Sequence, residues 1–383
     1  MTLSIAHVYN YMHPHYGGPP NVIVHLLQEQ LTRGYTLFLM ASDLDDPEVQ
    51  RTLPFHPNLH LVLIRPRWIR SLLSQPKIDR VLKQVDLVHF HSIWPTPCLT
   101  ISARCRALQC PYLLSVHGHL RPEALALKKW KKKVGLALGY ANFIHGAAAV
   151  HALNPSEKQD ALQFGLRQPI HIIPNGISPK KYPIKDLIES RDPLLEKTWS
   201  ILKDKPYILF LSRLHHRKGV FDLLHAFAQI HSLFPKHILV LAGGDHGCID
   251  EVQELIMHLN LTESVLLTGF VFGKEKDQLL RHADLFTLPS EHEGFSIAIL
   301  EALGYGLPTL ISSGCHFEEL GQSQMGWIHP LGIDGLKEGL LDILNDHQLS
   351  RERGINAQKW VFKHYSWKTI SGKYNQLYQD LRR

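Results

Sequence analysis

Short apolar runs of strand length alternate with longer amphipathic segments along almost the whole chain. Continuous apolar runs linked by helices are typical of parallel sheets that are covered on both faces. The repeated pairing of strand and helix therefore predicts an α/β protein with doubly wound sheets. The predicted strands are Leu3–Val8, Leu37–Met40, Leu59–Ile64, Leu87–Phe90, Tyr112–Val116, Ala147–His151, Ile170–Ile173, Tyr207–Leu211, His237–Ala242, Ser264–Thr268, Asp284–Leu288 and Pro308–Ile311. The clearest helical patterns are Asn21–Arg33, Ser156–Phe164, Val220–Phe234 and Ile249–Asn260.

The series of strands and helices breaks once, around residues 176–205. An Asn-Gly pair and two prolines in IPNGISPKKYPIKD are typical of a turn and linker. A chain of 383 residues is also long enough for two domains. We therefore predict Rossmann-like domains at 1–177 and 178–365, facing each other across a cleft, and a helical tail at 366–383. That tail carries Tyr374, Leu377, Tyr378 and Leu381 on one face.

The composition is that of an ordinary globular protein, with 44% hydrophobic and 20% charged residues. The net charge of +6 is spread along the chain, and no recognised nucleic-acid motif occurs, so we expect no nucleic-acid partner. Five cysteines without zinc spacing predict reduced thiols, and we expect a cytoplasmic protein. No apolar stretch reaches the roughly 18 residues of a membrane span, and the first residues read as a strand rather than a signal peptide. Any membrane contact is then peripheral.

Residues 289–308, PSEHEGFSIAILEALGYGLP, carry the most specific pattern for function. Glu293 and Glu301 flank a strand-to-helix turn formed by Gly294, Phe295 and Ser296, and Ser296 is a good helix N-cap. A helix N-terminus binds anions, because its first N–H groups are unpaired. The segment suits a sugar nucleotide, with phosphates at the helix start and carboxylates on sugar hydroxyls. Surface glutamates on an ordinary strand–turn–helix unit are the alternative.

A basic loop opens the second domain after the strand that ends at Leu211. Arg213 and Lys218, with Arg217 as a third candidate, lie between this strand and the next helix. Two cations on one loop suit a diphosphate, because arginine binds it as a fork and lysine as a point charge. A solvated basic turn is the alternative.

Further candidates follow other strands. Gly17 and Gly18 permit close approach of a ligand to the backbone, and Gly243, Gly244 and Asp245 form a second such loop. A nucleobase can rest on the main chain at Gly269 and Phe270, and either Glu318 or Glu319 can reach the cleft.

Histidines follow two strands of the first domain. His117 and, less directly, His119 and His91 lie where a substrate hydroxyl would bind, whereas His89 is expected to pack in the core. Ordinary turns and structural histidines are the alternatives.

Residues 126–135, ALKKWKKKVG, hold five lysines and one tryptophan. Basic segments with aromatic residues bind anionic lipid surfaces. Lys128–Lys133 is therefore a candidate for peripheral membrane contact, and a solvated helix face is the alternative.

Taken together and in this order, the Gly17-Gly18 loop, His117, IIPNGI at 172–177, LSRLHHRKG at 211–219, the Gly243 loop and residues 293–308 resemble those of the retaining GT-B glycosyltransferases of the large family-four type, group 1. The resemblance implies that Arg213 and Lys218 bind the donor diphosphate, that Glu293 contacts the donor sugar and that Glu301 contacts the ribose. It also implies that His117 lies by the transferred sugar, that the amides of 294–296 meet phosphate or sugar, and that the C-terminal helix returns to the first domain. Ser296 departs from the glycine that the family often has at this position. The family commonly has a glycine-rich turn and then a glutamate after the position of Gly314, and Glu319 is read as the matching glutamate.

We therefore expect transfer of a hexose-type sugar from a nucleoside diphosphate to a hydroxyl of a glycan or lipid-linked acceptor, with retention, in surface polysaccharide synthesis. Retention follows from the resemblance alone. Asp43 and Asp45 lack the context of a metal motif, so we expect no cofactor and no metal. An inverting GT-B enzyme, a nucleotide-sugar epimerase and a non-catalytic sugar-binding or nucleotide-binding protein are the alternatives. The donor base, whether uridine, guanosine or adenosine, stays open.

Overall fold

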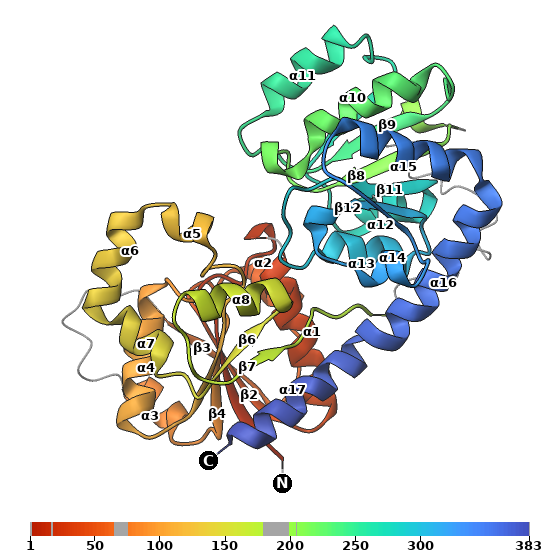
Figure 1. Ribbon diagram of the computed structural model, residues 1–383. Coiled ribbons are helices and arrows are strands. Elements are labelled where there is room, and N and C mark those ends of the chain that lie inside the picture. The colour runs from red at the N-terminus through yellow and green to blue at the C-terminus, as the bar shows by residue number, and fades with distance from the viewer. Residues whose placement is uncertain (1, 17, 65–75, 179–198, 204, 383) are drawn as a thin grey trace. The chain divides into compact units, whose positions relative to one another are not determined.

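The computed structural model describes residues 2–16, 18–64, 76–178, 199–203 and 205–382. The chain divides into two compact units, Met1–Gly176 with Trp367–Arg383, and Ile177–Ser366. Each unit is a parallel sheet with helices on both faces (Figure 1). The prediction of two doubly wound α/β domains is confirmed. Most of the predicted linker, residues 179–198, lies outside the described residues.

The first unit contains a seven-stranded sheet in the order β3-β2-β1-β4-β5-β6-β7 among the described residues. Every neighbouring pair is parallel, and each strand overlaps a predicted apolar run. The strands are β1 (Ser4–Val8), β2 (Thr36–Ala41), β3 (Leu59–Leu63), β4 (Leu87–Phe90), β5 (Tyr112–Ser115), β6 (Ala149–Ala152) and β7 (Ile170–Ile172).

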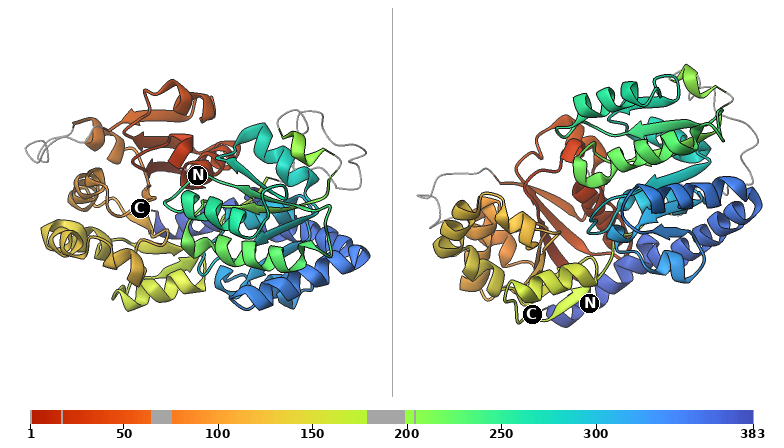
Figure 2. Two further views of the ribbon diagram at one scale, coloured as in Figure 1. Left: turned by 90° about the horizontal axis from the view of Figure 1, so that it is seen from above. Right: turned by 45° about the horizontal axis from the view of Figure 1, so that its top comes forward.

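Helices cover the two faces of this sheet in different ways (Figure 1; Figure 2). On one face α3, α4 and α7 pack onto apolar residues such as Val8, Val88 and Phe90. The other face, which carries alternate residues such as His7 and His89, lies under α1 and α17. The helices are α1 (Gly18–Thr32), α2 (Pro47–Thr52), α3 (Pro76–Leu82), α4 (Thr96–Ala107), α5 (Pro122–Ala126), α6 (Lys129–Gly135), α7 (Ala141–His145), α8 (Pro155–Gln163) and α17 (Trp367–Leu381), with short turns η1 (Pro14–Tyr16) and η3 (Leu136–Tyr140).

Helix α17 brings the end of the chain back to the first unit, as the resemblance implies. Tyr374, Leu377 and Tyr378 of its predicted apolar face are buried. Leu381, at the last turn, is half-buried.

The second unit contains a six-stranded parallel sheet in the order β10-β9-β8-β11-β12-β13 among the described residues. Its strands are β8 (Tyr207–Leu211), β9 (Ile238–Ala242), β10 (Val265–Gly269), β11 (Leu285–Leu288), β12 (Thr309–Ser312) and β13 (Trp327–His329). Strand β13 was not predicted, because three residues with a terminal histidine give too short an apolar run.

The helices of the second unit fill both sides of its sheet and share one large apolar core. They are α10 (Val220–His231), α11 (Ile249–His258), α12 (Gly273–His282), α13 (Ile297–Gly304), α14 (Glu319–Gln322), α15 (Ile333–Asn345) and α16 (His347–Tyr365), with turns η6 (Ser200–Leu202), η7 (His216–Lys218) and η8 (Ser313–Cys315). Among the described residues, no helix has both the length and the apolar character that crossing a membrane requires.

Candidate functional site

The loop after β8 is held against the loop after β11 by close backbone contact. Gly219 has a φ of +71°, and a Cβ atom there would lie 2.1 Å from the carbonyl oxygen of Pro289. Only glycine fits this combination of left-handed backbone and missing space. The turn η7, which ends at Lys218, is thereby fixed beside the loop that carries Glu293.

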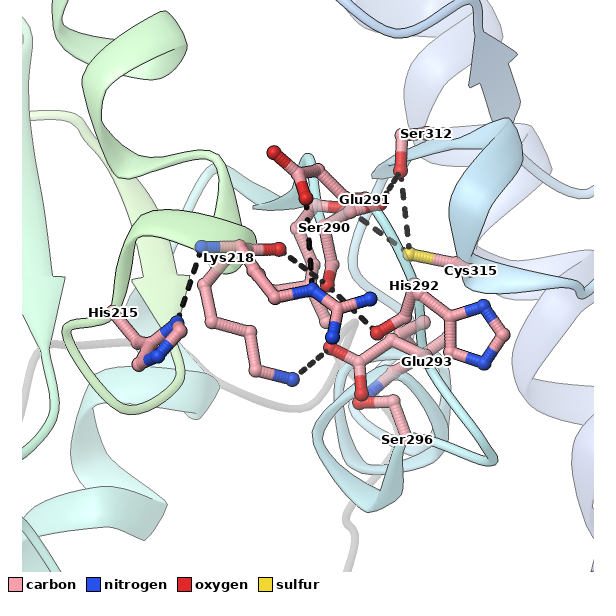
Figure 3. A network of polar contacts seen from close by, with 12 residues as sticks. His215, Lys218, Ser290, Glu291, His292, Glu293, Ser296, Ser312 and Cys315 are labelled. Atoms are coloured by element: carbon pink, nitrogen blue, oxygen red, sulfur yellow. Dashed lines mark hydrogen bonds and ion pairs between the residues drawn. The ribbon is translucent and has the colours of Figure 1, made fainter. Parts of the chain in front are cut away.

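Lys218 and Glu293 form an ion pair across these two loops (Figure 3). Lys218 Nζ lies 2.5 Å from Glu293 Oε1, and the two side chains are 15% and 11% exposed. A lysine ammonium has three donors and a carboxylate has two acceptor oxygens, so each group keeps hydrogen-bonding capacity for a ligand. The sequence placed both residues in the site but gave no sign that they touch.

Hydrogen bonds to backbone carbonyl oxygens hold the Glu293 loop in place. Ser290 Oγ and Glu291 N donate to the carbonyl oxygen of Arg217 at 3.1 and 2.9 Å. Glu293 N donates to the carbonyl oxygen of Gly314 at 2.9 Å. A Cβ atom at Gly314 would lie 2.3 Å from the carbonyl oxygen of Glu291, so this packing also requires glycine.

Helix α13 begins directly after this loop. Ser296 is its N-cap, and its Oγ accepts from Ile299 N at 3.4 Å, as predicted. The Phe295 ring packs near Phe317 and Tyr365, which turns its side chain to the core. Gly294, Phe295 and Ser296 are all partly exposed, so the backbone before the helix faces solvent in part. The segment has the form of an anion site at a helix N-terminus.

Glu301 lies within α13 and pairs with a lysine from α12. Lys276 Nζ donates to Glu301 Oε1 at 2.7 Å, and the side chains are 21% and 11% exposed. Lys276 was not predicted, since it lies on a different helix 25 residues earlier and only the fold joins the two.

Arg213 is exposed, and within the described part of the chain it makes no ion pair. Its positive charge acts on the neighbouring His215. Burial lowers the pKa of His215, and repulsion by Arg213, His216, Lys218 and Arg217 lowers it further. The loop thus has an excess of positive charge at the carboxyl edge of the sheet, where open α/β sheets bind ligands. A partly buried lysine–glutamate pair, a free cation and a helix start make a site suited to a phosphorylated sugar.

Comparison with known proteins gives the family of the chain. The family "Glycosyltransferase Family 4" matches residues 16–181, and "Glycosyl transferases group 1" matches residues 193–360. The chain belongs to the group 1 glycosyltransferases. The enzyme is a glycosyltransferase of the hexosyltransferase type with a GT-B fold, so the non-catalytic alternative falls away.

Two relatives and one solved structure of the same fold illustrate the match. An uncharacterized glycosyltransferase of Methanocaldococcus jannaschii is 25% identical over 77% of this chain and 75% of its own length. The GDP-mannose:cellobiosyl-diphosphopolyprenol alpha-mannosyltransferase of Xanthomonas oryzae is 23% identical over 99% of this chain and 97% of its own. The crystal structure of Anabaena HepE in complex with UDP and glucose superposes with a TM-score of 0.78 at 19% identity, covering 99% of this chain and 100% of that one.

The other predicted donor residues of the glycosyltransferase have partners of their own. Gly243 N donates to the carbonyl oxygen of Gly269 at 2.9 Å, and the carbonyl oxygen of Gly244 accepts from Leu214 N at 2.9 Å. Asp245 Oδ1 accepts from Gly247 N at 2.8 Å and further amides, which lowers its pKa and fixes the start of α11. Phe270 is exposed beside Gly269, where a flat base could lie.

The predicted residues of the first unit lie at the carboxyl ends of its strands. His117 follows β5 with a left-handed φ of 42°, and burial followed by repulsion from His151 lowers its pKa to about 3. Burial, and then repulsion from Lys132, lower the pKa of His119 to about 4.

The loop after β1 holds the other predicted residues of this unit. Gly18 is the first residue of α1, and Gly17 lies outside the described residues. Asp43 accepts from Met12 N and His13 N at 2.9 and 3.0 Å, so it braces the loop after β1.

The further acids that follow β12 are both exposed. Glu319 opens α14, and Glu318 precedes it. Neither forms an ion pair with another described residue, so the structure favours neither Glu318 nor Glu319 as the functional acid.

Proposed function

We propose that the enzyme transfers a hexose from a nucleoside diphosphate sugar to a hydroxyl of a saccharide or lipid-linked acceptor, with retention of configuration. The observation that carries the proposal is the contact between Lys218 Nζ and Glu293 Oε1 at 2.5 Å. It joins a phosphate-binding cation to a carboxylate that can accept from sugar hydroxyls, at the two ends of a sugar–phosphate bond.

Charge separation at the departing diphosphate is the main barrier in this reaction. Lys218 and Arg213 supply fixed positive charge, and the N-terminus of the eight-residue helix α13 adds its dipole. We propose that these groups make transfer metal-independent, with no cofactor. Glu293 orients the donor sugar, Glu301 accepts from the ribose, and the exposed Phe270 lies against the base.

His117 serves the transferred sugar as a neutral ring. A pKa of about 3 means that it carries no charge at neutral pH, so it exchanges hydrogen bonds with hydroxyls without attracting phosphate. Retention rests on the family to which the chain belongs.

The acceptor is proposed from the relatives and from the surface of the first unit. The Xanthomonas relative is named for a diphosphopolyprenol-linked acceptor, and the Anabaena structure contains UDP and glucose. We propose a lipid-linked saccharide as the acceptor, in surface polysaccharide synthesis at the inner face of the cell membrane, and the name of the Xanthomonas relative supports this acceptor.

Helix α6 and turn η3 carry the surface that we propose to contact this membrane. Leu127, Trp130 and Leu138 are 70%, 67% and 74% exposed, and Val134 is 49% exposed. Lys128, Lys129, Lys131 and Lys133 are exposed alongside, whereas Lys132 turns inward to the carbonyl oxygen of Ala124. Apolar side chains rimmed by lysines bind anionic lipid surfaces.

Thermal shift with UDP-, GDP- and ADP-sugars tests the donor site. A ligand that binds the folded state raises Tm by mass action. The sugar nucleotide with the correct base should raise the Tm of the wild type and of Lys236→Ala, which removes an exposed lysine of the same unit. It should not raise the Tm of Lys218→Ala or Arg213→Ala. Equal shifts in all four proteins would remove Lys218 and Arg213 from the site.

Vesicle sedimentation tests the membrane surface. Trp130→Ala with Leu138→Ala should reduce binding to anionic vesicles, while Phe55→Ala, which removes a still more exposed aromatic ring of the same unit, should not. If wild-type protein stays in the supernatant with both anionic and neutral vesicles, α6 is a solvated helix.

A further inference from the structure

Three histidines lie together inside the first unit. His7 of β1 and His89 and His91 of β4 are buried, with exposures of 0, 0 and 2%. One ring nitrogen from each lies within 4.8 Å of the others. None of them has a place in the proposed transfer.

The register of the sheet brings these rings together. His7 pairs with His89 across the β1–β4 ladder, and side chains alternate between the two faces, so both point to the face under α1 and α17. His91 lies just beyond the end of β4, and its ring stacks on that of His7 with centroids 5.2 Å apart.

Acceptor-only oxygens fix which nitrogens carry protons. The amide oxygen of Gln30 can only accept, so His7 donates to it from Nε2 at 2.8 Å. The other ring nitrogen of this tautomer, Nδ1, then has a lone pair. This lone pair faces His91 Nε2 at 2.9 Å.

His89 is oriented from the opposite side. The carbonyl oxygen of Ile173 accepts from His151 Nε2 at 2.7 Å, so His151 Nδ1 accepts from the Ser115 hydroxyl at 2.7 Å. Ser115 Oγ then accepts from His89 Nε2 at 2.7 Å, which leaves a lone pair on His89 Nδ1. That lone pair meets the Tyr378 hydroxyl at 2.8 Å.

We propose that His7, His89 and His91 bind one divalent transition-metal ion of the zinc type through three imidazole nitrogens. His7 and His89 present Nδ1 lone pairs, while their Nε2–H groups are held by Gln30 and Ser115. This is the usual arrangement around metal-bound histidines, in which an outer acceptor fixes the tautomer. His91 binds through Nε2 once its proton has moved to Nδ1, so the ring stays neutral.

The donor set selects the class of ion. Three neutral imidazoles without a carboxylate suit Zn²⁺, Co²⁺, Ni²⁺ or Cu²⁺ and disfavour Mg²⁺ and Ca²⁺, which prefer oxygen ligands. Binding displaces two hydrogen bonds, His91 to His7 and Tyr378 to His89. The ion would tie β1 and β4 together beneath α17, so its expected effect is on the stability of the first unit.

Cobalt binding to the full, tag-free chain tests the site, because Co²⁺ reports tetrahedral coordination in its visible spectrum. Chelator-treated protein is titrated with Co²⁺ as wild type, His91→Asn and His60→Asn, which removes an exposed histidine of the same unit. We expect one tetrahedral equivalent and a raised Tm in wild type and His60→Asn, and an affinity lower by roughly 100-fold or more in His91→Asn.

X-ray absorption on the Zn²⁺-loaded wild type keeps the test independent of whether His91→Asn folds. Three imidazole nitrogens around zinc support the site. Absence of a tetrahedral equivalent in wild type, the same affinity in His91→Asn, or fewer than three imidazoles around zinc would overturn it and leave a purely structural hydrogen-bond network.

Discussion

Two polar clusters of this glycosyltransferase differ in charge and in solvent exposure. In the second unit Lys218 and Glu293 are charged and keep part of their surface in solvent, 15% and 11%. In the first unit His7, His89 and His151 are fully buried and neutral, because burial lowers their pKa values. A charge kept at a sheet edge remains available to a ligand, whereas neutral groups inside the core can hold helices together.

The difference follows from the cost of desolvation. Burying an unpaired charge is far more expensive than burying a neutral group whose hydrogen bonds are satisfied. The histidine rings meet this condition through a continuous series of donors and acceptors that ends at Tyr374 and Tyr378 of α17. Variants that change charge at the first cluster and hydrogen bonds at the second should therefore behave differently.

The largest effect is expected from Glu293→Gln. The change keeps the shape of the side chain but removes the charge that pairs with Lys218, so kcat/KM should fall about 100-fold or more while Tm changes little. Initial rates with the sugar nucleotide found by thermal shift measure this effect. Glu291→Gln, which removes a neighbouring exposed carboxylate, is the control, and equal losses in both variants would contradict a specific role for Glu293.

Acid should destabilise the histidine cluster next most strongly. The pKa of His151 is lowered to about 4 by burial, and an unfolded histidine titrates near 6.5. Between these values the unfolded state binds the extra proton, so the contribution of His151, on the order of 3 kcal/mol, is complete above pH 6.5 and is lost as pH falls toward 4.

Urea unfolding of the wild type between pH 7.5 and 4.5 measures this slope. His151→Asn should flatten it, and His60→Asn should not. A slope that is unchanged in His151→Asn would mean that other groups cause the acid sensitivity.

A smaller loss is expected when the hydroxyl that docks α17 is removed. Tyr378→Phe leaves His89 Nδ1 and Gln30 Nε2 without their partner and should lower the free energy of unfolding by about 1–3 kcal/mol. Tyr35→Phe is the matched control, because the buried Tyr35 hydroxyl has no hydrogen-bond partner among the described residues. Urea denaturation that ranks the two variants equally would show that the network adds nothing to docking.

The smallest effect is expected at Lys276. Lys276→Met removes the partner of Glu301 at a pair with 21% and 11% of its side chains exposed, so the KM for the donor should rise a few-fold, with kcat nearly unchanged. Lys274→Met changes an exposed lysine of the same helix and is the control. A fall in kcat at constant KM would assign Lys276 to the chemical step instead.

The sequence predicted the fold class and the edges at which the candidate residues lie. Twelve apolar runs were enough for this, because a buried parallel strand has an apolar pattern of its own. Strand β13 and Lys276 escaped prediction for a common reason. A three-residue run and a lone lysine carry no local pattern, and their meaning comes from neighbours distant in the chain.

By itself the sequence determined the alternation of strands and helices and the Ser296 cap, since these depend on residues near one another. Tertiary structure decided which side chains meet: Lys218 with Glu293, Glu301 with Lys276, and the histidines of β4 and β6 with the tyrosines of α17. Strand order and register determine these contacts, and burial then determines the charge of each group. Both act between segments far apart in sequence, which no local pattern records.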